Sequence, residues 1–339
     1  MVEEPQLRQG TKRLRPFVSS AKVSHRGTSR PLQRVVTDFA ADVPYAQVVD
    51  KLIEHYDVPL NESTIRRITM RHGQQMLEAK PTEIAWPKNK GEAQVIAEMD
   101  GSMVPIMEPD PQQTDQRKGK KLLWKEAKLC LARAEGQRLL HYGGTLEGGV
   151  EEAGEQLFTC AIQAGFGQST QLHAVGDGAS WIANQVDKRF GAQGRYLIDF
   201  YHACDYLSAA AKTTQEKSKT WLETQKTRLK TGKVQEVLAT LESRMESSDV
   251  KDVEAPVRCA YRYLSQRQHQ LHYAETIKKA LPIGSGEIES AHRYIIQQRL
   301  KRPGAWWRKH NAETLLALRL NRANRQWCDY WGDAYQEAT

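Results

Sequence analysis

The stretch VIAEMDGS (residues 95–102) is an apolar run that ends in an aspartate followed by a glycine. The stretch QLHAVGDGASWI (residues 171–182) repeats this arrangement, with Asp177 in the place that Asp100 takes in the first. A short apolar run bounded by a turn residue is typical of a buried strand, and glycine allows the backbone to turn tightly. A single Asp-Gly after a strand is usually an ordinary turn, but two placed alike favour a shared site. We therefore predict that Asp100 and Asp177 end two buried strands.

The segments around these runs predict the rest of a sheet. The order strand, strand, strand, helix, strand, helix, strand is that of a ribonuclease H-like fold, in which the first and fourth strands are neighbours at the centre. We therefore predict an α/β protein with a ribonuclease H-like mixed sheet. Besides the strand that begins at Val95, the apolar spacing predicts strands over Ala127–Ala132, Arg138–Tyr142, Leu172–Val175 and Tyr196–Phe200, and helices over Glu151–Ala164 and Ile182–Phe190.

A third acidic stretch, GSGEIESAH (residues 284–292), predicts the start of a helix that carries Glu287 and Glu289. Acids in the first turn of a helix suit its dipole without any catalytic role. Beside Asp100 and Asp177, however, a helix-borne glutamate completes a set of carboxylates, the ligands that Mg²⁺ and Mn²⁺ prefer. The acids together predict a two-metal site that cuts phosphodiester bonds.

A long polar stretch from about Ala203 to Ala280 separates the second and third acids. Lysine and glutamate interleave along it and strand signals are few, so we predict an all-helical insertion. The chain then divides into four parts. These are a basic arm and helix-turn-helix-like DNA-binding module (1–90), the first part of the catalytic core (91–205), the insertion (206–280), and a catalytic-core helix with basic C-terminal helices (281–339).

The N-terminal region is basic and then helical. No acidic residue occurs between Pro5 and Thr37, which favours an arm that settles on phosphates, or an inert tail. Two amphipathic helices follow, and Asn61 can cap the second, which bears Arg66, Arg67 and Arg71. This pattern fits a helix-turn-helix-like module whose arginines meet DNA, and it fits an ordinary helical hairpin equally well.

The segment KRPGAWWRK (residues 301–309) places two tryptophans between two pairs of cations. Such tryptophans can stack on an unpaired base while the cations hold phosphates, and they can equally anchor a turn onto the core. The candidate DNA-binding residues here are Lys301, Arg302, Trp306, Trp307, Arg308 and Lys309. A basic amphipathic helix is predicted over Ala312–Trp327.

Composition bounds the classes of function. The 339 residues include 49 Lys and Arg against 41 Asp and Glu, a formal charge of +8 that favours a polyanionic partner. No apolar stretch approaches the roughly 18–20 residues that span a bilayer, so we expect a cytoplasmic, nucleoid-associated protein with no membrane partner. The five scattered cysteines favour reduced thiols. His202 and Cys204 alone are too few ligands for zinc, and Glu126 is a candidate for support of the main site.

Three blocks of the chain together resemble the catalytic blocks of bacterial insertion-sequence transposases of the DDE class. The blocks are MDGS (99–102), GDGASWI (176–182) followed by LIDFYHACDYL (197–207), and GSGEIESAHRYIIQQRLKRPGAWW (284–307). The group they resemble most is the ISKra family, which is mutator-like in style. The resemblance covers roughly Val95 to Trp307.

The resemblance implies a role for each acid. Asp100 would be the first metal ligand, Asp177 the second and Glu289 the third, with Glu287 as a rival. Glu289 is preferred because comparable transposases have a Gly-x-x-Glu spacing, matched here from Gly286 to Glu289. The implied activity is cutting of transposon DNA ends and joining of the freed 3′-OH to target DNA, with two Mg²⁺ or Mn²⁺ ions. A homodimer or larger assembly on double-stranded DNA is expected. The alternatives are a nuclease or resolvase that only cuts, and a transposase-derived protein that only binds DNA.

Overall fold

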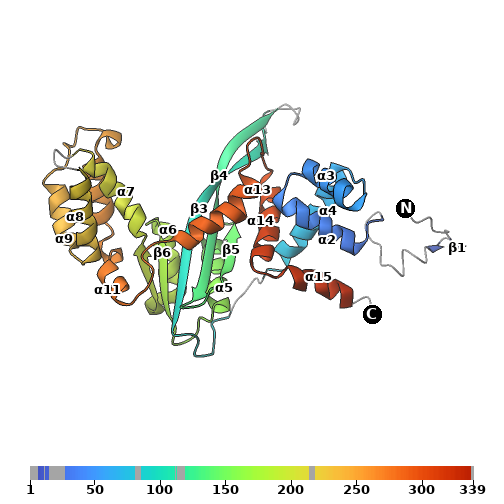
Figure 1. Ribbon diagram of the computed structural model, residues 1–339, viewed down its shortest axis with the longest axis horizontal. Helices are drawn as coiled ribbons and strands as arrows, with labels where there is room; N and C mark the ends of the chain where they lie inside the picture. The colour runs from blue at the N-terminus through green and yellow to red at the C-terminus, as the bar shows by residue number, and fades with distance from the viewer. Residues whose placement is uncertain are drawn as a thin grey trace. The chain divides into compact units, whose positions relative to one another are not determined.

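The computed structural model is of an α/β protein with a five-stranded mixed sheet and many helices (Figure 1). It forms two compact units: unit 1 comprises 1–83, 103–125 and 293–339, and unit 2 comprises 84–102 and 126–292. The division falls within two long strands, β3 (Gln94–Pro109) and β4 (Lys120–Ala134), and so differs from the predicted boundaries at residues 90, 205 and 280. The structure describes residues 7–10, 12–14, 27–80, 85–110, 112, 119–213 and 218–336.

The sheet of unit 2 has the strand order β5-β4-β3-β6-β7. Strand β3 pairs in parallel with β6 from Gln94↔Gln171 to Glu98↔Val175, and β6 pairs in parallel with β7. Strand β5 is antiparallel to β4. The prediction that the first and fourth strands are neighbours is therefore confirmed. The remaining strands of this sheet are β5 (His141–Thr145), β6 (Gln171–Gly176) and β7 (Gly194–Ile198).

The two faces of β3 differ because side chains alternate along a strand. Val95, Ala97 and Met99 lie in the main hydrophobic core, which helices α5 (Val150–Gln163) and α6 (Ser180–Phe190) complete. Glu98 and Asp100 face the other way. The core thus fixes the register of β3, since a slip by one residue would bury both acids in it.

Several strand limits differ from the prediction. Asp100 does not end its strand: β3 continues to Pro109, because Gly101 stays in the strand rather than forming a turn. Strand β4 is likewise longer than predicted, and β5 begins three residues later than expected. Strand β7 stops at Ile198, because Asp199 caps a helix by accepting hydrogen bonds from the N–H groups of Tyr201 and His202.

The described residues of the predicted insertion form helices joined by loops and no strand, and this part is drawn in yellow to orange in Figure 1. Trp221, Leu229 and Leu241 extend the main core into it. The helices are α7 (Phe200–Ala211), α8 (Ser218–Lys230), α9 (Val234–Glu242), α10 (Pro256–Ser265) and α11 (Tyr273–Lys278), followed by the short α12 (Gly286–Ala291).

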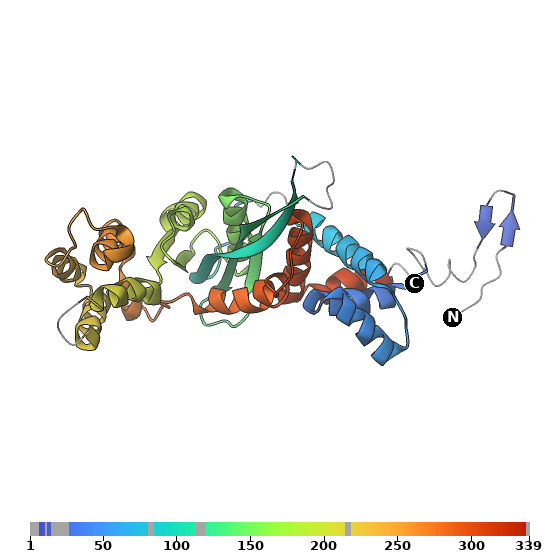
Figure 2. The ribbon, with the colours of Figure 1, turned by 90° about the horizontal axis from the view of Figure 1, so that it is seen from above.

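Unit 1 contains the predicted pair of N-terminal helices and one more, α2, drawn in blue (Figure 2). The third helix corrects the predicted arm: Arg30 and Arg34 belong to α2, while residues 1–6, 11 and 15–26 lie outside the described residues. Val36, Val48, Leu52 and neighbouring residues form a separate core. The helices are α2 (Arg30–Asp42), α3 (Tyr45–Tyr56) and α4 (Glu62–Glu78), and a small sheet pairs β1 (Leu7–Gln9) with β2 (Lys12–Leu14).

The C-terminal segment of unit 1 packs on these helices. It comprises a π-helical turn, η4 (His292–Gln297), then α13 (Gln298–Leu300), α14 (Lys309–Ala323) and α15 (Trp327–Gln336); only His292 of η4 belongs to unit 2. Helix α14 is not the amphipathic surface helix that was predicted, because every residue from Ala312 to Leu320 is buried. Its Arg319 reaches backbone carbonyls of Ile295, Tyr294 and Ala41, which satisfies a buried guanidinium.

Candidate active site

Asp100 and Asp177 lie at one level of the central strand pair. The parallel ladder ends at Glu98↔Val175, and each aspartate is two residues further along its own strand or the loop after it. Burial raises the pKa of the Asp177 carboxyl, and the negative charges of Asp100 and Glu126 raise it further. The two carboxylates are therefore close enough to repel each other, so a cation between them would be stabilised.

The two aspartates are each followed by a glycine, and a side chain is excluded at each glycine for a different structural reason. Gly178 has a φ of +88°, and a side chain there would collide with the hydroxyl of Tyr263, which donates to the carbonyl oxygen of Asp177 at 2.6 Å. At Gly101 the missing side chain leaves room for Glu126, whose Oε1 would lie 2.2 Å from an added Cβ. Both glycines therefore let other elements approach the two aspartates.

Helix α12 lies over the polar face of β3. The N–H of Ile288 donates to Glu98 Oε2 at 2.7 Å, and His292 Nε2 lies 3.2 Å from Asp100 Oδ2. Ile288 and His292 are four residues apart on the helix, which is about 6 Å at 1.5 Å per residue, and Glu98 and Asp100 are two residues apart on the strand, which is about 6.6 Å at 3.3 Å per residue. The two spacings are therefore nearly equal. This matching holds α12 along β3, with its C-terminal end beside Asp100.

The two candidate glutamates of α12 project to opposite sides. Each is about 100° around the helix from Ile288, which faces β3. Glu287 pairs with Arg133 Nε at 2.9 Å. Arg133 lies beside the first residues of β3, because the N–H of Glu135 donates to the carbonyl of Gln94.

Glu289 therefore lies on the side of α12 away from Arg133, and it is exposed. The contacts bring Asp100, Asp177, Glu126 and His292 together, and they hold Glu287 away from them. They do not bring Glu289 into contact with either aspartate.

Glu98 is a buried acid that the sequence analysis missed. Its residue is 2% exposed, and burial raises the pKa of its carboxyl to about 8; the negative charges of Glu287 and Asp199 also raise it. The hydrogen bond from Ile288 partly offsets this effect. One feature of the sequence could have indicated it: Glu98 interrupts an apolar run two residues before Asp100.

Asp199 ties the start of α12 to the end of β7. Its buried carboxylate accepts from the N–H groups of Tyr201 and His202, and from both the N–H and the hydroxyl of Ser285 at 2.5 and 2.6 Å. The backbone N–H of Phe200 also donates to the carbonyl of Ile283. Asp199 therefore positions α12 over the sheet.

Replacing this carboxylate should destabilise the protein. Asp199→Ala leaves buried N–H donors without an acceptor, and hydrogen bonds to charged groups contribute about 1.5–3 kcal/mol each. We expect the free energy of unfolding to fall by about 2–4 kcal/mol in urea denaturation. Asp205→Ala, an exposed acid on the same helix, is the control and should change it little. Equal stability of the two variants would contradict the role given to Asp199.

The polar residues around α7 do not form a second site. Cys204 is buried in the core, where burial raises the pKa of its thiol to about 12, while His202 is exposed. Helix geometry separates residues two apart, so the two do not present ligands to one ion. His202 instead lies near Asp177, because its positive charge lowers the pKa of that carboxyl.

The residues around Asp100 and Asp177 determine whether this site fits a metal ion. Among the described residues, no three His, Cys, Asp or Glu side chains form a group that could hold a metal ion. The two carboxylates nevertheless fit a hard cation by residue type, and the raised pKa of Asp177, caused by burial and by the negative charge of Asp100, means that a cation beside it would be stabilised. Asp100 and Asp177 are thus candidates for two ligands, and Glu289 stays a prediction for the third.

The predicted DNA-binding arginines of α4 differ in exposure. Arg66 is exposed, Arg67 is half-buried and bonded to Thr64 Oγ1, and Arg71 donates to the side chain of Gln33. Gly73, further along α4, is covered by Thr314 of α14, since an added Cβ would meet its carbonyl oxygen at 2.7 Å. Arg66 in the first turns of α4 is therefore exposed, whereas Arg71 is half-buried and engaged by Gln33 within unit 1.

The two neighbouring tryptophans also have different environments. Trp307 is buried, its Nε1 donates to the carbonyl of Leu300 at 3.0 Å, and Arg299 stacks on its ring. Of the two interpretations, Trp307 fits the anchoring of a turn onto the core and not base stacking, because its ring is already packed. Trp306 is 38% exposed and stays a candidate. Arg308 is exposed just before α14, Lys309 begins that helix, and Lys301 and Arg302 are half-buried.

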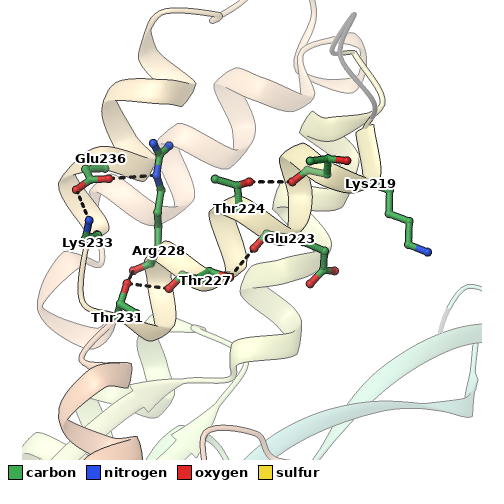
Figure 3. Close-up of a pocket in the computed structure, with 9 residues that line it drawn as sticks. Lys219, Glu223, Thr224, Thr227, Arg228, Thr231, Lys233 and Glu236 are labelled. Carbon is green, nitrogen blue, oxygen red and sulfur yellow. Dashed lines mark hydrogen bonds and ion pairs between the residues drawn. The ribbon is translucent and has the colours of Figure 1, made fainter.

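A shallow hollow of about 820 Å³ lies between α8 and α9 (Figure 3). Two of its cations are paired, since Arg228 and Lys233 both contact Glu236. The hydroxyls of Thr224, Thr227 and Thr231 donate to carbonyls of their own helix. None of the predicted site residues lines this hollow, which carries no evident ligand chemistry.

The comparisons with known proteins identify no family. No protein-family model matches the chain, and no curated protein matches it. Among the described residues, none of the helices combines the length and the apolar character needed to cross a membrane.

Proposed function

We propose that the protein is a DDE transposase with a ribonuclease H-like catalytic core. The observation that carries the proposal is the level placement of Asp100 and Asp177 on the parallel strands β3 and β6, with α12 lying over the same strand. The strand order β5-β4-β3-β6-β7 supports the ribonuclease H-like core, since the first strand of this sheet, β3, lies at its centre beside the fourth, β6.

The chain's own residues would prepare the site for DNA. Asp100 and Asp177 would hold two Mg²⁺ or Mn²⁺ ions, with Glu289 as the third acid. Such ions activate a water and stabilise the leaving 3′ oxygen when a phosphodiester is cut. The N–H of Gly101 donates to the Asp100 carboxylate at 2.7 Å, and the N–H of Ala179 donates to that of Asp177 at 2.8 Å; His292 Nε2 lies 3.2 Å from Asp100 Oδ2. Joining exchanges one phosphodiester for another, so no covalent protein intermediate is needed.

The chain also carries features suited to DNA. The net charge of +8, exposed Arg66 at the start of α4 and exposed Arg308 before α14 would meet phosphates. Two DNA ends must be joined in one reaction, so a homodimer or larger assembly on DNA is part of the proposal.

A strand-transfer assay tests this function. The full chain is incubated with end-labelled DNA carrying the sequences that flank its gene, together with a supercoiled target plasmid. We expect cleavage at the element ends and joined product with Mg²⁺ or Mn²⁺, and complete loss of both with EDTA.

The products of this assay distinguish the alternatives. Cleavage without joined product would identify a nuclease or resolvase. DNA binding without cleavage, in both metals, would identify a protein that only binds DNA. Cleavage that persists in EDTA would overturn the metal-dependent mechanism.

A further inference from the structure

Strand β4 presents an exposed face in unit 1. Lys120, Leu122 and Trp124 alternate with other residues along the strand, so their side chains share one face. All three are exposed, and Trp124 is 56% exposed despite its large indole. The ribbon that β4 forms with β3 is the long teal hairpin of Figure 1. A tryptophan this open on a rigid strand is poorly explained by packing.

Trp306 meets Trp124 on this face. Their ring centroids are 6.1 Å apart with an interplanar angle of 61°, and Trp306 is 38% exposed. The backbone beside Trp306 is fixed, because the N–H of Trp307 donates to the carbonyl of Pro105 and the N–H of Met107 donates to the carbonyl of Trp307. The two exposed rings are therefore held in place before any ligand binds.

The charge around the two rings is positive. The sequence from Gly119 to Lys125 contains three lysines and no acid, and the sequence from Leu300 to His310 contains four lysines and arginines and no acid. Lys121 and Arg308 are exposed. Aromatic faces flanked by cations suit nucleic acid, because bases stack on the rings while the cations hold phosphates. An apolar protein partner would not require so many cations.

We propose that Trp124 and Trp306 together form a stacking site for an unpaired base of DNA. The partner is single-stranded or locally opened DNA, such as an enzyme needs when it distorts a DNA end. This role rests on the proposed function, in which DNA ends are cut and joined. It replaces Trp307, which is buried, with Trp124, which the sequence analysis did not consider.

Binding without catalysis tests the stacking site. An oligonucleotide carrying 2-aminopurine, single-stranded or within a mismatch bubble, is titrated with the full chain in EDTA, so that no cutting occurs. We expect Trp124→Leu and Trp306→Leu to weaken binding of this DNA by about 5- to 100-fold and to change duplex binding little. Trp124→Phe keeps an aromatic ring and should retain most of the affinity.

Controls separate stacking from general effects. Trp86→Leu removes another exposed tryptophan, in unit 2, and should leave binding unchanged. Lys121→Ala should weaken single-stranded and duplex binding alike and reduce the salt dependence. If a leucine variant melts at a lower temperature, tryptophan fluorescence provides a second readout. Single-stranded DNA should quench the emission of the wild type, and this quenching should be lost in the double variant Trp124→Phe/Trp306→Phe.

The outcomes distinguish this site from the proposed function. Unchanged single-strand affinity of both leucine variants, while the wild type cuts DNA, overturns the stacking site alone. Selective loss of single-strand affinity in a protein that never cuts DNA supports the stacking site and overturns the transposase. A change in oligomeric state without a change in DNA binding would assign this face to a second copy of the chain and overturn the stacking site.

Discussion

Asp177→Asn should abolish DNA cleavage while leaving the protein folded. Loss of a metal-binding carboxylate removes several kcal/mol of transition-state stabilisation, so we expect the rate of cleavage to fall by about 10³-fold or more. The asparagine keeps the size of the side chain and its carbonyl can still accept from the N–H of Ala179. Cleavage of labelled DNA ends in Mg²⁺ and in Mn²⁺ is the measurement.

The stability of this variant provides a second measurement, in which no loss is expected. Burial and the negative charge of Asp100 raise the pKa of the Asp177 carboxyl in the folded chain. The folded state therefore holds its proton more tightly than the unfolded state does. The Asp177 carboxyl makes stability fall as pH rises from the ordinary carboxyl range through its raised pKa. Asp177→Asn lacks this contribution, so its stability should fall less with pH than that of the wild type, in which Glu98, with a pKa of about 8, also contributes.

We therefore expect Asp177→Asn to melt at the same temperature as the wild type or higher at neutral pH, without metal. Asp205→Asn, an exposed aspartate of the same type, is the matched control and should keep both activity and melting temperature. If Asp177→Asn cut DNA at the wild-type rate, Asp177 would not belong to the active centre.

The sequence predicted the sheet better than the borders of its strands. Apolar runs mark β3, β4, β6 and β7 because those strands are buried, and the order of the runs correctly predicted that β3 and β6 are neighbours. The end of β3 was missed because Gly101 looked like a turn, whereas it stays in the strand to accommodate Glu126. Local patterns do not reveal such packing between strands.

The contacts around the acids were also beyond the sequence. Glu98 and Ile288 are far apart in the chain and meet only because α12 returns to β3 after the helical insertion. Likewise, nothing local distinguishes Trp306 from Trp307, since their difference arises from the pairing of this segment with β3. The residue types of the candidate site were predictable, but their partners depend on contacts made late in the chain.

The two glutamates of α12 provide the sharpest comparison of roles. Glu289→Gln should reduce DNA cleavage by about 10³-fold, as expected for loss of an acidic ligand, while its exposed side chain contributes little to stability. Glu287→Gln should do the reverse. It breaks the ion pair between Glu287 and Arg133. Both side chains of this pair are partly exposed, so we expect the free energy of unfolding to fall by about 0.5–1 kcal/mol and cleavage activity to be nearly full.

The comparison is decisive because one variant should lose cleavage and keep stability, while the other should lose stability and keep cleavage. Both variants change one carboxylate to an amide on the same helix, two residues apart, so damage to α12 itself would affect the two alike. Urea denaturation and cleavage of labelled DNA ends are measured on both. Cleavage lost in Glu287→Gln and kept in Glu289→Gln would transfer the third role to Glu287. Cleavage kept in both would direct attention to Glu126, whose negative charge already acts on Asp177 from the opposite face of the sheet; Glu126→Gln would then have to lose activity for a third acid to remain part of the mechanism.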